Sequence, residues 1–178
     1  MERLVGKPAP AFKMNAVTGD GSDFIKVNSE DYQDKWLVLF FYPLDFTFVC
    51  PTEITGFSKK YEKFKELGAE ILGVSCDSQY SHQAWIKQSK DNGGLGKINF
   101  PLASDLTKSV SEQYGVLIED EGISLRGLFI IDPKGVIKYS VTHDLNVGRS
   151  VDETLRVLKA LKTGGLCAIN WEEGDPNL

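Results

Sequence analysis

Three cysteines, at positions 50, 76 and 167, are the side chains of this chain best suited to chemistry, because a thiolate is a strong nucleophile and a redox-active group. Cys50 is followed by Pro51 and then by Glu53. Proline is tolerated in the first turn of a helix and acidic residues are favoured there, so the pattern predicts a helix that begins at Cys50. Unpaired backbone N–H groups and the helix dipole at such a position favour a thiolate over a thiol. Cys50 is therefore a candidate reactive cysteine.

Two residues upstream of Cys50 are of types that can form a pocket around it. Thr47 lies three residues earlier, so that on a helical turn its hydroxyl would face the sulfur. Pro43 has no N–H and a fixed φ, and it can form a pocket wall without competing for hydrogen bonds. The alternative is that Cys50, which follows Phe48 and Val49, is an ordinary small buried side chain. The cysteine taken alone does not decide between the two interpretations.

The elements that must position these residues follow from the periodicity of apolar side chains. The pattern predicts, in order, a hairpin over 9–30, a buried strand over 36–42, a helix with apolar residues at 54, 57, 61 and 64, a strand at 71–74, a helix over 79–91, a short helix over 106–114, a hairpin over 127–141, and a helix opened by the capping box Ser150-x-x-Glu153. Alternating strands and helices with a hairpin at each end predict an α/β fold, with a central mixed sheet flanked by helices. Cys50 would lie between the strand at 36–42 and the next helix, where strand ends and helix starts converge to form binding sites.

Length and composition fit one globular domain and exclude several classes of protein. A chain of 178 residues is long enough to bury roughly 70% of its unfolded surface. With 25 acidic and 20 basic residues, no basic surplus remains for phosphates, so we expect no nucleic-acid partner. The longest apolar run, 36–42, is far shorter than the roughly 20 residues that cross a bilayer, so we expect no membrane span. The first eight residues lack the pattern of a signal peptide, and we expect a cytoplasmic protein.

Cysteine usage narrows the chemistry further. Structural disulfides are not expected in the cytoplasm, so redox-active or catalytic roles are favoured for the cysteines. The chain contains no Cys-x-x-Cys pair, and its three cysteines and two histidines do not have the spacing of a zinc site. We therefore expect no metal and no other cofactor.

The segment Pro43-x-x-x-Thr47-x-x-Cys50, extended through Pro51-Thr52-Glu53, resembles the active-site signature of the peroxiredoxins. Further matching segments lie at 7–10, 74–78, 81–85, 100–105 and 125–132, so the resemblance covers nearly the whole chain. The match is to the typical two-cysteine group, which includes the peroxidase subunit of bacterial alkyl hydroperoxide reductase. This resemblance implies a thioredoxin-like fold, with a peroxidase domain over 1–163 and a C-terminal tail over 164–178.

The resemblance also implies an activity, the reduction of hydrogen peroxide and alkyl hydroperoxides without metal or flavin. Cys50 would attack the O–O bond as a thiolate and become a sulfenic acid. Thr47 would hydrogen-bond the peroxide, Pro43 would shield the pocket, and Arg126 would stabilise the thiolate and the developing oxyanion. Without the resemblance, Arg126 reads as a surface arginine at the entrance of a strand. Glu53 would either orient a nearby group or only complement the helix dipole.

Cys167 matches the resolving cysteine of the family, and Trp171 follows it as in that group. The family usually has Val before and Pro after this cysteine, whereas Leu166 and Ala168 flank it here. The resemblance implies that Cys167 of one subunit attacks the sulfenic acid of another and leaves an intersubunit disulfide. Thioredoxin or a flavoprotein disulfide reductase would then reduce that disulfide. Homodimers that can assemble into decamers are implied as well. The alternative is an ordinary thiol in a loose tail.

Two further features carry expectations of their own. Cys76 follows the apolar strand at 71–74 and is expected to be a buried, unreactive thiol. The loop at 93–96 matches a segment that, in this family, accompanies sensitivity to overoxidation when a C-terminal helix with Tyr-Phe is also present. Because the sequence stops at Leu178 without such a helix, we expect resistance to sulfinic-acid formation.

Two other classes of function compete with the peroxidase. The first is a binding or chaperone module with a thioredoxin-like fold, in which the peroxide site is secondary. The second is a dithiol oxidoreductase, which is disfavoured because no Cys-x-x-Cys supplies the second thiol.

Overall fold

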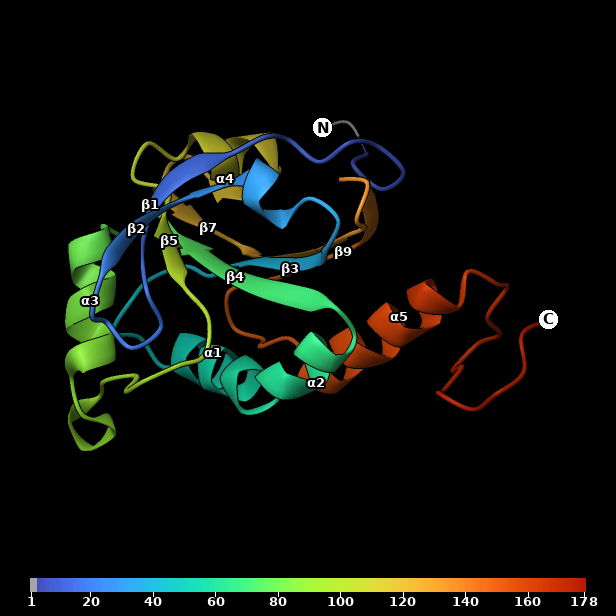
Figure 1. The fold of residues 1–178 in the computed structure, drawn as a ribbon. Helices are drawn as coiled ribbons and strands as arrows, with labels where there is room; N and C mark the ends of the chain where they lie inside the picture. The colour runs from blue at the N-terminus through green and yellow to red at the C-terminus, as the bar shows by residue number, and fades with distance from the viewer. Residues whose placement is uncertain (1–2) are drawn as a thin grey trace.

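The computed structural model describes residues 3–178, and its core is one seven-stranded sheet (Figure 1). The strands follow the order β2-β1-β5-β4-β3-β8-β9 across the sheet. Their bounds are β1 (Lys13–Val17), β2 (Phe24–Asn28), β3 (Trp36–Phe41), β4 (Ala69–Ser75), β5 (Leu102–Ser104), β8 (Arg126–Ile131) and β9 (Ile137–His143). At the centre, β3 pairs in parallel with β4 and antiparallel with β8. The expected α/β fold with a mixed sheet is therefore confirmed, including the N-terminal hairpin formed by β1 and β2.

Helices cover both faces of this sheet. The α-helices are α1 (Cys50–Lys59), α2 (Tyr61–Glu66), α3 (Gln79–Lys87), α4 (Ser109–Gln113) and α5 (Val151–Thr163). Two short 3-10 helices, η1 (Ser29–Tyr32) and η2 (Lys90–Asn92), and a small hairpin of β6 (Leu117–Ile118) and β7 (Ile123–Ser124) complete the described elements. In Figure 1, α1, α2 and α5 lie below the sheet and α4 lies above it.

Strand β3 reads as a continuous apolar run because both of its faces are covered. Val38 and Phe40 belong to the core shared with α1 and α5, where Phe40 stacks on Phe57 with ring centroids 4.9 Å apart. Leu39 and Phe41 belong to the core on the opposite face, shared with α4. The end of β3 is thus held rigidly from both sides at the point where the chain leaves for Cys50.

Several predicted boundaries are wrong in ways that the backbone explains. The single helix expected through 54–64 is two helices, because Lys60 leaves helical geometry at φ −103°, ψ 8°. Phe57 and Phe64 on either side of this break are both fully buried. The helix expected over 106–114 begins only at Ser109, since Lys108 has a left-handed backbone with φ 65°. The three-residue strand β5 was not predicted, because it is too short to show a period.

Helix α5 begins directly after Ser150, as predicted, and the Ser150 side chain accepts a hydrogen bond from the backbone N–H of Glu153. The Glu153 carboxylate accepts from Arg156 instead of closing a capping box on Ser150. It ends before Gly164, whose φ of 70° closes the helix. The tail that follows is irregular and lies against α5, where Arg156 donates to the Trp171 carbonyl at 2.8 Å. Within residues 3–178, none of the helices has the length and apolar character needed to cross a membrane.

Candidate active site

Cys50 is the first residue of α1 and directly follows the loop that leaves β3. The helix begins here because Pro51 occupies its first turn, where a missing N–H costs nothing. The preceding residue, Val49, offers no side-chain cap. The predicted helix start is confirmed. Cys50 is only 1% exposed, so its sulfur is shielded from solvent in this conformation.

A buried guanidinium lies next to this sulfur. Arg126 begins β8 and its Nη1 lies 3.4 Å from Cys50 Sγ. The same side chain is held by two acceptors, the Leu145 carbonyl at 2.8 Å from Nε and a Glu53 carboxylate oxygen at 2.8 Å from Nη1. Arg126 is therefore not a surface arginine. A fixed positive charge within contact of a thiol stabilises its thiolate form.

Glu53 holds a second arginine that the sequence did not reveal. Arg149 donates from Nε to Glu53 Oε1 at 2.7 Å and from Nη2 to Oε2 at 3.0 Å, and its backbone N–H adds a third bond at 2.8 Å. Arg149 also lies over the Phe40 ring, 5.3 Å from its centroid. Glu53 thus orients arginines, which settles the alternative left open above. Arg149 directly precedes Ser150, the N-cap residue of α5. Its local sequence gives no indication that it contacts Glu53.

The charged side chains of this cluster sum to a net positive charge beside the Cys50 sulfur. Burial by itself would raise the pKa of Glu53, but the hydrogen bonds and charge of Arg149, together with the charge of Arg126, bring that pKa below its ordinary value. The carboxylate is therefore ionised and compensates one of the two guanidinium groups. One net positive charge remains in a buried cluster that touches Cys50. Such a surplus stabilises negative charge on the sulfur or on an oxygen bound next to it.

Thr47 and Pro43 lie on the loop between β3 and α1. Pro43 is buried at the start of that loop. Thr47 does not share a helical turn with Cys50, because α1 begins only at residue 50, and that premise of the prediction is wrong. Its hydroxyl donates instead to the Leu44 carbonyl at 2.9 Å. With its proton engaged there, the Thr47 oxygen retains lone pairs that can accept a hydrogen bond.

Cys167 lies in the tail beyond α5, and it does not approach Cys50 within the chain. In Figure 1 the tail extends to the right of the molecule, whereas α1 begins at the lower left beneath the sheet. Around Cys167 Sγ lie Thr163 Oγ1 at 3.5 Å and the Ala160 carbonyl at 3.6 Å. A disulfide between these two cysteines of a single chain would therefore need a large rearrangement.

Cys76 lies just after β4 and is buried against α4, where its sulfur is 3.8 Å from Ser111 Oγ. Burial raises the pKa of the Cys76 thiol, and the charge of Asp105 adds to that rise. A thiol with a raised pKa is a poor nucleophile at neutral pH. Both cysteines are buried, but the sulfur of Cys76 contacts a serine hydroxyl, whereas that of Cys50 contacts the Arg126 guanidinium.

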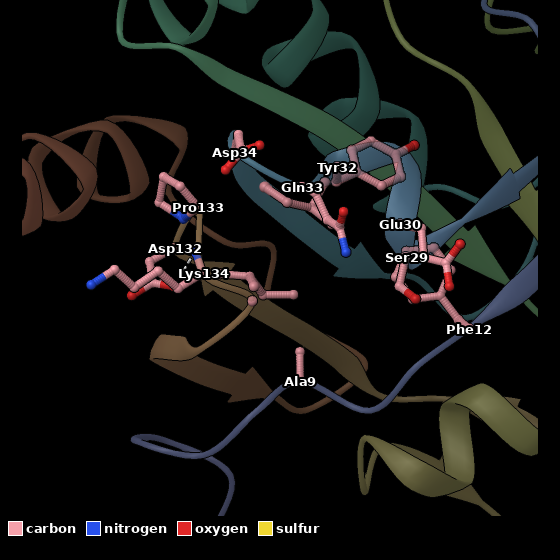
Figure 2. Close-up of a pocket in the computed structure, with 13 residues that line it drawn as sticks. Ala9, Phe12, Ser29, Glu30, Tyr32, Gln33, Asp34, Asp132, Pro133 and Lys134 are labelled. Carbon is pink, nitrogen blue, oxygen red and sulfur yellow. Dashed lines mark hydrogen bonds between the residues drawn. The ribbon is translucent and has the colours of Figure 1, made fainter.

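One cavity among the described residues has no cysteine in its lining. It has a volume of about 340 Å³ and lies between η1 and the turn that joins β8 to β9. Figure 2 shows Pro133 and Lys134 on one side of it and Ser29 and Phe12 on the other, with Asp34 next to Pro133. Among residues 3–178, no three His, Cys, Asp or Glu side chains are grouped so that they could hold a metal ion.

Comparisons with known proteins agree with this geometry. The model of the AhpC/TSA family matches residues 5–140. A protein from Clostridium pasteurianum described as a putative peroxiredoxin in a rubredoxin operon is 72% identical over 178 residues, with all of both chains covered. The reduced 2-Cys peroxiredoxin of Plasmodium vivax is 44% identical and superposes with a TM-score of 0.95 over 99% of this chain and 93% of that one. Thioredoxin peroxidase I of Plasmodium yoelii is 42% identical, with a TM-score of 0.84 over 97% of this chain and 100% of that one.

Proposed function

The chain belongs to the AhpC/TSA family and is a typical two-cysteine peroxiredoxin, a thiol peroxidase, and on that premise we propose that Cys50 reacts with the peroxide and Cys167 resolves the product. The substrates would be hydrogen peroxide and alkyl hydroperoxides. The observation that carries the proposal is the contact between Arg126 Nη1 and Cys50 Sγ at 3.4 Å. Of the three cysteines, Cys50 is the one whose sulfur lies within 4.0 Å of a cationic nitrogen in the described hydrogen bonds.

In the first step the Cys50 thiolate attacks one oxygen of the peroxide and the O–O bond breaks. The sulfur keeps the attacked oxygen as a sulfenic acid, and the second oxygen leaves as an alkoxide or hydroxide that takes up a proton. Negative charge moves from sulfur to the leaving oxygen during this step. The fixed guanidinium of Arg126 stabilises both the starting and the developing charge. The oxygen of Thr47 accepts a hydrogen bond from the peroxide, which orients it for attack.

In the second step the Cys167 sulfur attacks the sulfenic acid, water leaves, and a disulfide forms. Cys50 is 1% exposed at the base of its loop, so the loop and the first turn of α1 must open before another sulfur can reach it. The separation of the tail from α1 within one chain supports attack by Cys167 of a second subunit. A dithiol then reduces the disulfide, supplying two electrons and two protons. We propose thioredoxin or a flavoprotein disulfide reductase as that dithiol, and the name of the Plasmodium yoelii relative supports the first.

We also propose that the chains form homodimers, which can assemble into decamers. The catalytic loop itself carries exposed apolar side chains, with Phe48 92% exposed and Phe46 48% exposed. Strand β9 is the last strand of the sheet, and Ile137 at its start exchanges backbone hydrogen bonds with Gly6 and Lys7. The outer edge beyond Ile137 can continue the sheet into a second copy. Both features are of the kind that a partner subunit covers.

The experiment is peroxide consumption driven by a thioredoxin system, measured for Cys50→Ser, Cys167→Ser and Cys76→Ser. The last variant is the matched control, because it makes the same change at a buried cysteine outside the site. We expect Cys50→Ser to lose all turnover and Cys167→Ser to lose thioredoxin-driven turnover while still consuming one equivalent of peroxide. Full activity in Cys50→Ser would show that the peroxide does not react at Cys50. Full thioredoxin-driven turnover in Cys167→Ser would show that Cys167 is not the resolving cysteine and would favour a one-cysteine mechanism.

A further inference from the structure

A buried carboxylate in the catalytic loop takes no part in the chemistry described above. Asp45 lies between Pro43 and Thr47, and its side chain is 1% exposed. It accepts three hydrogen bonds, from the Tyr42 hydroxyl at 2.9 Å, from Ser81 Oγ at 2.7 Å and from His82 Nδ1 at 2.8 Å. We call these four residues the loop anchor. These three hydrogen bonds restrain the loop at Asp45.

His82 is fully buried on α3, and both of its ring nitrogens face acceptors. Nε2 lies 3.1 Å from the Ala103 carbonyl, which can only accept, so this nitrogen carries a hydrogen. Nδ1 lies 2.8 Å from the Asp45 carboxylate and 3.3 Å from the Tyr42 hydroxyl, so the imidazole is fixed on both sides of its ring. Pulling Asp45 away from His82 would leave an uncompensated polar group inside the protein, which is costly.

The backbone of Asp45 is fastened as well. Its N–H donates to Asp77 Oδ2 at 2.9 Å, and the same oxygen accepts from Ser75 Oγ at 2.7 Å. The residue that follows β3, the segment that follows β4 and helix α3 thus all hold the chain at residue 45.

One residue later the loop changes character. Phe46 is half exposed and has a left-handed backbone with φ 56°, a conformation that is strained for an aromatic residue. Its described ring contact is with Trp85, at 5.8 Å between centroids. Phe48 is almost fully exposed. Within a single chain, the segment 46–49 therefore has little buried surface to lose on opening, whereas opening through residue 45 would break the loop anchor.

We propose that the loop anchor fixes the upstream limit of loop opening, so that Asp45 and His82 are positioning residues that set the rate at which Cys50 becomes available to Cys167. This proposal rests on the proposed function, in which Cys50 must leave its buried site to form a disulfide. A firm anchor at residue 45 keeps the opened segment short and allows it to close again quickly. A weakened anchor lets a longer segment open more often.

The test uses Asp45→Ala, His82→Ala and Asp45→Asn. The first two remove the central bonds of the anchor. The amide of Asp45→Asn can still accept from the Tyr42 hydroxyl with its oxygen, and its nitrogen can donate to His82 Nδ1, because His82 Nε2 already donates to the Ala103 carbonyl. This variant therefore keeps the bonds that the alanine variants remove. Val110→Ala on α4, at a buried position on the opposite face of the sheet, is the control for a general loss of stability.

The reduced proteins are mixed with one equivalent of hydrogen peroxide, quenched over time, and assayed by mass spectrometry for sulfenic acid and for disulfide. We expect the two alanine variants to convert sulfenic acid to disulfide about tenfold faster than the wild type, which corresponds to about 1.4 kcal/mol. Asp45→Asn and Val110→Ala should convert it at the wild-type rate. Wild-type conversion rates in both alanine variants would contradict the proposed role of the loop anchor. The same holds if Asp45→Asn converts sulfenic acid as fast as Asp45→Ala.

Deuterium exchange of the reduced proteins separates failure of the anchor from failure of the proposed function. If no disulfide forms even in the wild type, the two-cysteine mechanism is wrong. The anchor is then judged by the amides of residues 46–50, which should exchange about tenfold faster in the two alanine variants and at the wild-type rate in Asp45→Asn. Equal exchange in all four proteins would overturn the anchor by itself.

Discussion

Arg126 Nη1 and Cys50 Sγ lie 3.4 Å apart although 76 positions separate them in the chain. The contact exists because β3, which leads to Cys50, pairs directly with β8, which begins at Arg126. The guanidinium cannot turn away, since its Nε is bonded to the Leu145 carbonyl and its Nη1 to Glu53. The sheet thus brings a fixed positive charge to the sulfur.

Arg126→Lys tests the value of that fixed geometry. A lysine ammonium carries its donors on one nitrogen, so it cannot occupy both the Nε position next to the Leu145 carbonyl and the Nη1 position next to the sulfur and Glu53. We expect the rate of Cys50 oxidation to fall about 100-fold, the effect of losing one well-placed donor to a developing charge. The measurement is the second-order rate constant for peroxide in stopped flow. Arg156→Lys, at an arginine on the outer side of α5, is the matched control and should react at the wild-type rate.

Glu53→Gln tests the buried charge cluster through its pH dependence. Because the pKa of Glu53 is lowered in the folded state, its contribution to stability is present above its ordinary pKa of 4.5 and is lost as pH falls through the folded value. At neutral pH the variant should be less stable by about 3 kcal/mol, since two buried guanidinium groups lose their counter-charge. Urea unfolding across this pH range should show the difference between the two proteins shrinking in acid. A constant difference would show that Glu53 is not ionised in the cluster.

Thr47→Val and Thr47→Ser together test the acceptor role of the Thr47 oxygen. Valine keeps the shape and removes the oxygen, whereas serine keeps the oxygen. We expect oxidation of Cys50 to slow about tenfold in the valine variant, the equivalent of one hydrogen bond, and to stay near the wild-type rate in the serine variant. Equal rates in both variants would mean that the peroxide does not use this oxygen.

The Cys76 thiol should be unreactive toward alkylating reagents in the native protein. Burial raises its pKa, so we expect iodoacetamide to label it only after denaturant unfolds the chain. Peptide mass spectrometry before and after unfolding measures this directly. Rapid labelling of Cys76 in the folded protein would contradict its assignment as an unreactive thiol.

The parts of the site that lie next to one another in sequence could be predicted. The apolar run of β3, the proline after Cys50 and the spacing of the following helix are local signals, and together they place Cys50 at a helix start at the end of a buried strand. The mixed sheet followed from the same periodicity, because alternation of strands and helices leaves few architectures.

Contacts made across the sheet could not be predicted in the same way. Arg149 reaches Glu53 across 96 positions and His82 reaches Asp45 across 37. Nothing in the local pattern of either partner indicates the other, because an arginine before a helix cap or a histidine on a helix has many possible environments. Even the break at Lys60 depends on how α1 and α2 pack on the sheet, and not on a helix-breaking residue type.

The most direct test of the account is the identity of the chains joined by the disulfide. Unlabelled Cys167→Ser and Cys50→Ser labelled with heavy nitrogen are mixed under reducing conditions that allow subunits to exchange, and are then treated with one equivalent of hydrogen peroxide. We predict a cross-linked peptide pair in which Cys50 comes from the unlabelled chain and Cys167 from the heavy chain. Absence of this pair, in a mixture where the wild type does form the Cys50–Cys167 disulfide, would contradict resolution between subunits.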